Sequence, residues 1–83
     1  MYFVYAIKSQ NHNWIYVGIT DDINRRLKQH NSEHNKSTKH YAPFDLIYTE
    51  ECINRPSARI REKYFKSSGG KTRLRKILEN SNS

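Results

Sequence analysis

A positively charged side chain, Arg26, falls on a helical face of this sequence where apolar residues are expected. In the predicted first helix, Ile23 and Leu27 lie four residues apart and define that face. Residues at i, i+3, i+4 and i+7 share a face, so Arg26 and His30 lie beside this pair, whereas Arg25 faces solvent. An arginine beside a core stripe requires an anion, an open cleft or a stem that reaches water. Arg26 is therefore either a structural residue or part of a binding cleft.

A negatively charged residue, Glu62, occupies a similar place in a second predicted helix. Ala58, Arg61, Glu62 and Phe65 follow the i, i+3, i+4, i+7 spacing, so the carboxylate lies among apolar neighbours. A carboxylate in such surroundings requires a cation. That cation is either Arg26, in which case both charges are structural, or a divalent metal ion, which prefers carboxylate and phosphate oxygens.

Tyrosines add a third kind of reactive group. The sequence holds six of them, and Tyr5 and Tyr16 lie in predicted strands. Gly18 follows Tyr16 by two residues and has no side chain, so the gap on that strand face could admit a substrate backbone. The alternative is that the tyrosines fill a small core and reach water with their hydroxyls. Spacing alone leaves both interpretations open.

Six predicted elements, in the order ββαβαα, must position these side chains. A polar turn joins the first two strands into an antiparallel hairpin. The first two helices each begin at capping residues, and a Ser-Gly stretch ends the second. The predicted strands are Tyr2–Ile7, Trp14–Gly18 and Phe44–Glu50, and the helices run from Thr20–Asp22 to His30, from Asn54–Pro56 to Ser67–Gly70, and over Lys71–Asn80.

This order predicts one α/β domain of the α+β type over residues 1–83, a small three-stranded antiparallel sheet flanked by about three helices. No apolar run approaches the roughly 20 residues that cross a bilayer, so we expect no membrane association. The single cysteine, Cys52, excludes an internal disulfide. No basic segment precedes the short apolar run at the N-terminus, so we expect no signal peptide and a cytoplasmic protein.

The charge of the chain indicates a polyanionic partner. Fifteen Lys and Arg against eight Asp and Glu give a formal net charge of +7. Eight of the fifteen lie in the last third, and a basic surface on a small domain is typical of nucleic-acid binding. The alternative is an ordinary solvated basic surface. The basic residues that we expect to contact nucleic acid are Lys8, Lys39, Arg59, Lys63, Lys66 and Lys71.

The motifs together resemble the GIY-YIG nuclease superfamily. A strand ending in FVY (Phe3–Tyr5) is followed by YVG (Tyr16–Gly18), by Arg26 eight residues past the glycine, and by the helical Glu62. The resemblance covers nearly the whole chain. It is greatest to the small stand-alone bacterial members, which are similar to the N-terminal nuclease domain of the bacterial excision-repair endonuclease.

This resemblance implies a reaction and a role for each residue. The motif tyrosines correspond to Tyr5 and Tyr16, the catalytic arginine to Arg26, the histidine or tyrosine position to His30, and the metal-binding glutamate to Glu62. The implied reaction is hydrolysis of DNA phosphodiester bonds with a single Mg²⁺ or Mn²⁺ ion. Arg26 would contact the phosphate, and a tyrosine or His30 would accept a proton from water.

Two departures from the family pattern affect these expectations. The first tripeptide lacks its glycine, as in many small members. Ile19 stands where repair-type members carry a lysine, so one positive charge is either missing or supplied by Lys8, Lys39 or Lys66.

Three functional classes follow from the sequence. The first is a metal-dependent endonuclease that acts in DNA repair or processing. The others are a catalytically silent nucleic-acid-binding module and a basic accessory protein, with RNA as the alternative polyanion. Because no DNA-targeting domain is recognised, we expect a protein partner to supply specificity.

Overall fold

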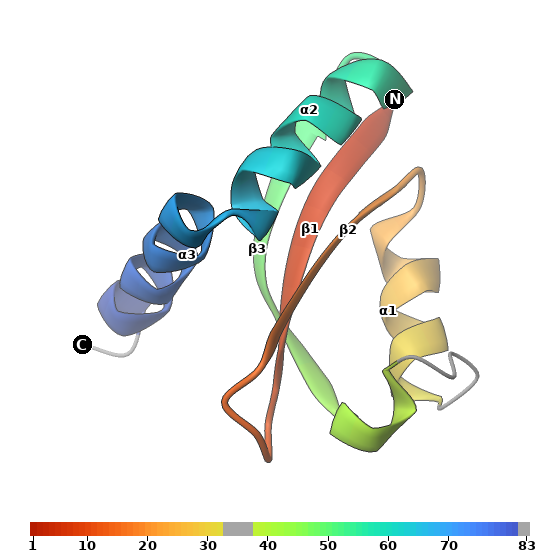
Figure 1. Cartoon of the computed structure of the whole chain (residues 1–83). Helices are drawn as coiled ribbons and strands as arrows, with labels where there is room; N and C mark the ends of the chain where they lie inside the picture. The colour runs from red at the N-terminus through yellow and green to blue at the C-terminus, as the bar shows by residue number, and fades with distance from the viewer. Residues whose placement is uncertain (33–37, 82–83) are drawn as a thin grey trace.

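The computed structural model describes residues 1–32 and 38–81. Three strands, three α-helices and one short 3-10 helix, η1, make up the fold (Figure 1). Among the described helices, none is long and apolar enough to cross a membrane. In chain order the elements are β1 (Tyr2–Ser9), β2 (Ile15–Thr20), α1 (Ile23–Asn31), η1 (Lys39–Tyr41), β3 (Phe44–Cys52), α2 (Arg55–Lys66) and α3 (Ser68–Ser81).

The three strands form one antiparallel sheet in the order β2-β1-β3, which confirms the predicted fold class. β1 lies in the centre, and Tyr5 pairs with Gly18 of β2 on one side and Thr49 of β3 on the other. An irregularity between Ala6 and Ile7 shifts the register against β3. Both β2 and β3 are edge strands, so each leaves one backbone edge open for contacts outside the sheet.

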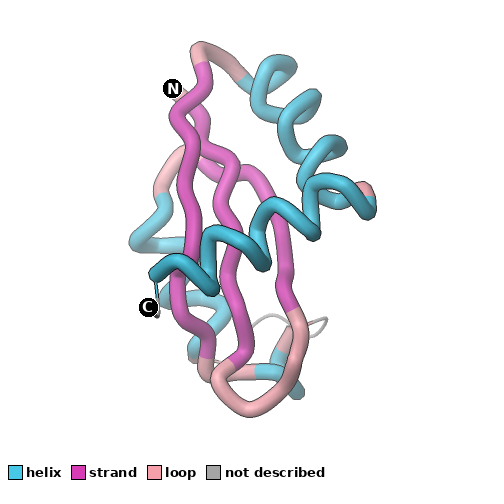
Figure 2. Tube along the Cα trace, turned by 90° about the vertical axis from the view of Figure 1, so that its left-hand side faces the viewer, coloured by secondary structure: helices cyan, strands magenta, loops and turns pink. Residues whose placement is uncertain are grey.

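Helices cover both faces of the sheet, and alternation along β1 decides which core each residue enters. Val4 and Ala6 pack with α2 and α3, whereas Tyr5 and Ile7 face the opposite cluster under α1 and η1. α2 lies against β1 and β2, and α3 packs on β3. Figures 1 and 2 show α1 apart from the other two helices, and in Figure 2 α3 crosses in front of the strands.

The helix starts were predicted at their capping residues, and the structure shows those caps. The Asp22 side chain accepts a hydrogen bond from the Arg25 backbone N–H at 3.0 Å. Asn54 does the same for the Ser57 N–H at 3.0 Å, with a proline in the first turn of α2. Each cap satisfies a backbone donor that has no partner within its helix.

The predicted start of the last helix was wrong. α3 begins at Ser68, so Gly69 and Gly70 lie inside its first turn and do not separate it from α2. A Cβ atom on Gly70 would overlap the Tyr64 carbonyl oxygen and the Phe65 Cα. Glycine is therefore required here for the close approach of α3 to the end of α2, and α2 itself ends at Lys66 with Ser67 as its cap.

A buried polar chain ties α1 to the rest of the fold. His30 is fully buried, its Nε2 lies 2.9 Å from the Tyr5 hydroxyl and its Nδ1 lies 2.9 Å from Thr38 Oγ1. The next residue, Asn31, accepts from the Phe44 N–H at 2.7 Å and donates to the Phe44 carbonyl at 3.3 Å. The C-terminal end of α1 is therefore fixed to β1, to the start of β3 and to Thr38 by directional contacts.

We expect His30 to make the fold sensitive to mild acid. Burial, and then the charge of Arg26, lower the pKa of His30 from 6.5 to about 4. The unfolded chain therefore binds this proton first, and the free energy of unfolding decreases as pH falls from about 6.5 to 4, by up to about 3 kcal/mol. Urea unfolding across this range measures the slope.

The matched variants are His30→Gln, which removes the titration, and His40→Gln, which changes an exposed histidine of η1. His30→Gln should flatten the pH dependence above pH 4.5, and His40→Gln should leave it unchanged. Equal slopes in the two variants would contradict the assignment to His30.

Candidate active site at the β2 edge

Gly18 provides the space into which Tyr5 extends. A Cβ atom built on Gly18 would lie 2.7 Å from the Tyr5 hydroxyl oxygen and 3.1 Å from Cε1 of Tyr16. The gap expected to admit a substrate backbone is thus filled by the Tyr5 ring, and that expectation was wrong. The missing side chain instead lets the Tyr5 ring cross β2, so its hydroxyl reaches the residues of α1.

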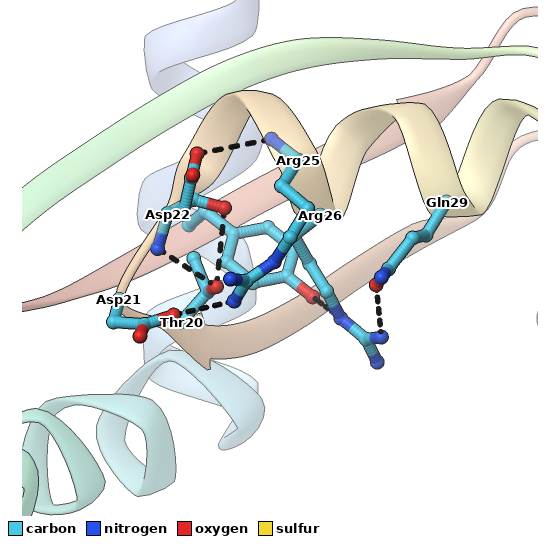
Figure 3. A network of polar contacts seen from close by, with 7 residues as sticks. Thr20, Asp21, Asp22, Arg25, Arg26 and Gln29 are labelled. Carbon is cyan, nitrogen blue, oxygen red and sulfur yellow. Dashed lines mark hydrogen bonds and ion pairs between the residues drawn. The ribbon is translucent and has the colours of Figure 1, made fainter.

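Arg26 meets the Tyr5 hydroxyl from α1. Its Nε donates to that oxygen at 3.3 Å, and its Nη1 donates to Gln29 Oε1 at 2.9 Å (Figure 3). Both partners are uncharged, and no carboxylate among the described residues pairs with Arg26. The arginine is half-buried, so its positive charge is held in a defined position without a counter-ion.

The neighbouring Arg25 behaves as the helical periodicity predicted. It points to solvent and pairs with Asp21 at 2.5 Å, with both side chains more than half exposed. Gln29, placed by the same periodicity on the solvated side, is half-buried and contacts Arg26. The Arg26 side chain turns along the helix towards the residue three positions later, which backbone periodicity alone does not reveal.

The two motif tyrosines lie in different environments. Burial raises the pKa of Tyr5 to about 12, and the Arg26 hydrogen bond offsets only part of that effect. The Tyr16 ring lies 6.2 Å from the Tyr5 ring and 5.0 Å from the His30 ring, and it is half-buried. Tyr5 therefore remains protonated and acts as a fixed hydrogen-bonding group, while Tyr16 is the more accessible hydroxyl.

His30 lies behind Tyr5, away from solvent. Both of its ring nitrogens are within hydrogen-bond distance of hydroxyl groups, those of Tyr5 and Thr38. Its lowered pKa keeps the ring neutral at physiological pH. In this arrangement the imidazole orients Tyr5.

Glu62 is buried and faces two exposed cations of its own helix. Lys66 Nζ lies 3.3 Å and Arg59 Nη1 lies 3.5 Å from its carboxylate oxygens. The predicted surroundings of apolar residues alone were therefore incomplete, because periodicity did not show where these two long side chains turn. Its negative charge also contributes to the raised pKa of Tyr5, so the α2 carboxylate acts on the site from close by.

A different carboxylate neutralises the neighbouring arginine of α2. Arg61 donates to both Glu50 oxygens, at 2.5 and 3.0 Å, and its guanidinium lies 5.1 Å from the Phe65 ring centroid. This hydrogen bond lowers the pKa of Glu50. The pair joins α2 to β3 and is a structural contact.

The donor set suits one hard divalent ion. In the described part of the chain, no three His, Cys, Asp or Glu side chains gather as a metal cluster, so Glu62 would be the protein carboxylate at the ion. Mg²⁺ is commonly bound through one or two carboxylates, with water and substrate phosphates completing its shell. A lone buried carboxylate fits such an ion and does not fit a structural zinc site.

The basic residues expected to contact nucleic acid lie in three places. Arg59 and Lys66 flank Glu62, and Lys63 and Lys71 are exposed on α2 and α3. Lys39 is exposed on η1. Lys8 instead donates to the backbone carbonyls of Ser9 and His12, at 2.9 and 3.4 Å.

Sequence reasoning missed three residues of this region. Gln29 orients Arg26, Thr38 contacts His30, and Arg55 lines an open cavity beside Arg26. Thr38 had been noted only as a loop residue near the cleft. The tripeptide motifs carry no signal for any of the three, because each acts through a neighbour that the fold brings to it.

Comparisons with known proteins agree with this geometry. The model of the family described as "GIY-YIG catalytic domain" matches residues 1–76. The chain is 35% identical to the UPF0213 protein YazA of Bacillus subtilis, over 99% of this chain and 83% of that protein. It is 32% identical to the UPF0213 protein CPE1444 of Clostridium perfringens, over 98% and 87%.

A solved structure shares the fold as well. The solution NMR structure of the UPF0213 protein BH0048 from Bacillus halodurans superposes with a TM-score of 0.54 at 30% identity, over 93% of this chain and 85% of that one. The chain belongs to the GIY-YIG catalytic domain family, whose nuclease domain supports an endonuclease-like function on nucleic acid.

Proposed function

We propose that this protein is a divalent-metal-dependent endonuclease that hydrolyses phosphodiester bonds of DNA. The observation that carries the proposal is the Arg26 guanidinium, held by two uncharged partners beside an open cavity. A purely structural arginine at this depth would be expected to pair with a carboxylate. Here the charge stays available for a phosphate group.

Arg26 would contact the non-bridging oxygens of the scissile phosphate. Charge-assisted hydrogen bonds from guanidinium to phosphate are short and directional, and they strengthen as negative charge develops in the transition state. Tyr5 and Gln29 hold the guanidinium before substrate arrives, so little reorganisation is needed at the moment of reaction.

Tyr16 is the proposed general base. Of the two motif tyrosines it is the more accessible, whereas Tyr5 is committed to His30 and Arg26 and has its pKa raised. An ordinary phenol has a pKa near 10 and is protonated at neutral pH. A divalent ion held by Glu62 would supply Lewis-acid charge at the phosphate and favour the ionised form of a nearby hydroxyl.

Glu62 can exchange its present partners for such an ion. Arg59 and Lys66 are more than half exposed, so each pair with Glu62 contributes at most about 1 kcal/mol. We assign the protein to DNA repair or processing, with a partner protein that selects the substrate. A catalytically silent nucleic-acid-binding module is the alternative, and turnover with Mg²⁺ or Mn²⁺ on branched, single-stranded and duplex DNA separates the two.

The two neighbouring arginines should differ in activity. Arg26→Ala should lower the cleavage rate by about 100-fold or more, because it removes the charge that stabilises the transition state. Arg25→Ala should leave the rate within about twofold, since its partner is the exposed Asp21. Single-turnover cleavage and thermal melting of both variants provide the measurement. Loss of cleavage in Arg25→Ala alone would contradict the assigned roles.

The two acidic residues of the ion pairs should separate function from stability. In chelator, Glu62→Gln should change the free energy of unfolding by less than about 1 kcal/mol, because its partners are exposed. Its cleavage with Mg²⁺ or Mn²⁺ should be lost. Glu50→Gln should do the opposite: it weakens the bidentate pair with Arg61 by about 1 kcal/mol and leaves cleavage intact.

Urea unfolding with chelator and metal-dependent cleavage test this pair of variants. A loss of about 3 kcal/mol or more in Glu62→Gln would identify Glu62 as a buried structural charge and would count against the metal site.

A further inference from the structure

An open cavity of about 350 Å³ lies between α1, the end of β2 and the first residue of α2. Four charged side chains line it, Asp21, Arg25, Arg26 and Arg55. Arg55 is the only one of them that comes from the α2 side. The cavity therefore extends from the proposed reaction centre towards a residue that has no part in the mechanism above.

The charges of this lining do not balance. Asp21 pairs with Arg25 at 2.5 Å, so these two cancel. Arg26 has only uncharged partners. Arg55 is exposed, and no ion pair or side-chain hydrogen bond joins it to any residue in the described ranges 1–32 and 38–81. Two uncompensated guanidinium groups from different helices thus face one cavity, and their mutual repulsion is relieved by an anion between them.

The size and chemistry of the cavity select the kind of anion. Its volume falls at the lower end of the range for small-molecule sites. Guanidinium groups match the geometry of phosphate oxygens and bind them through paired hydrogen bonds. A phosphate group with its attached sugar suits such an open, polar site better than an apolar ligand does.

The spacing along α2 relates this cavity to the proposed metal site. Arg55 precedes Glu62 by seven residues, two helical turns, so the two lie on the same face about 10 Å apart along the axis. Phosphates of one B-form strand are about 3.4 Å apart along its axis, and an extended strand spaces them more widely. A strand cleaved near Glu62 would therefore bring a phosphate to Arg55 within about one to three nucleotides.

We propose that Arg55, together with Arg26, forms a second phosphate subsite, which holds a backbone phosphate about one to three nucleotides from the cleaved bond. The subsite rests on the proposed nuclease function and adds the path of the substrate strand, from the α1 side of the β2 edge to the start of α2. Arg55 is a binding residue here and takes no part in the chemical step.

The first experiment uses inorganic phosphate and needs no turnover. Side-chain Nε–Hε resonances of Arg55 and Arg26 should shift with a saturable dependence on phosphate at constant ionic strength. Arg55→Ala should abolish the saturable response of Arg26. Arg73→Ala is the matched control, because Arg73 is an exposed arginine of α3 whose charge acts on Glu50 of β3 at the opposite edge of the sheet. A linear response, or equal loss in both variants, would overturn the subsite.

The second experiment places the phosphate on the substrate. Arg55→Ala should raise KM by about tenfold and leave kcat unchanged, as expected for loss of one charge-assisted contact. Arg55→Lys should recover part of this loss, and Arg73→Ala should have less than a twofold effect. Replacing single phosphates by neutral methylphosphonates should reproduce the KM increase at one position, and at that position Arg55→Ala should add nothing further.

Absence of coupling at every position would overturn the subsite even if cleavage is robust. If the protein shows no turnover, the proposed function fails, while the phosphate titration and oligonucleotide affinity still decide on Arg55.

Discussion

The Tyr5 hydroxyl is the contact on which the site and one side of the fold depend. It lies 2.9 Å from the His30 ring and 3.3 Å from the Arg26 guanidinium, above the space left by Gly18. α1 has only nine residues and few apolar positions, so its burial alone would define its orientation poorly. Directional contacts to Tyr5 and to the Phe44 backbone fix where α1 lies, and with it the position of the arginine.

Local sequence signals were sufficient to predict most of the fold. Alternating β-branched and aromatic residues gave the three strands, and Asp22 and Asn54 marked two helix starts through side-chain caps that the structure contains. The start of α3 was misplaced because Gly69 and Gly70 are usual in turns. Their role in packing α3 against the end of α2 depends on a tertiary contact, which no local signal contains.

The candidate site was predictable only as far as the backbone decides it. Helical periodicity separated Arg26 from Arg25, because the direction of a Cβ follows from its place on the helix. It could not reveal that Gln29 would hold Arg26, or that Lys66 and Arg59 would turn towards Glu62. Long side chains choose among several rotamers, and the neighbours that decide between them come from tertiary structure.

The chain contains an internal contrast between structural and available charges. Arg61 and Glu50 satisfy each other through two hydrogen bonds, an arrangement that closes both groups to other ligands. Arg26 and Glu62 are more deeply placed, yet each is held by partners that leave its charge accessible: neutral groups for the arginine, exposed cations for the carboxylate. Had the two paired directly, desolvation would have been offset within the protein. Keeping them apart sacrifices that stabilisation and leaves one positive and one negative group at the same strand edge. A phosphate and a divalent cation are the complementary charges that such an edge would attract.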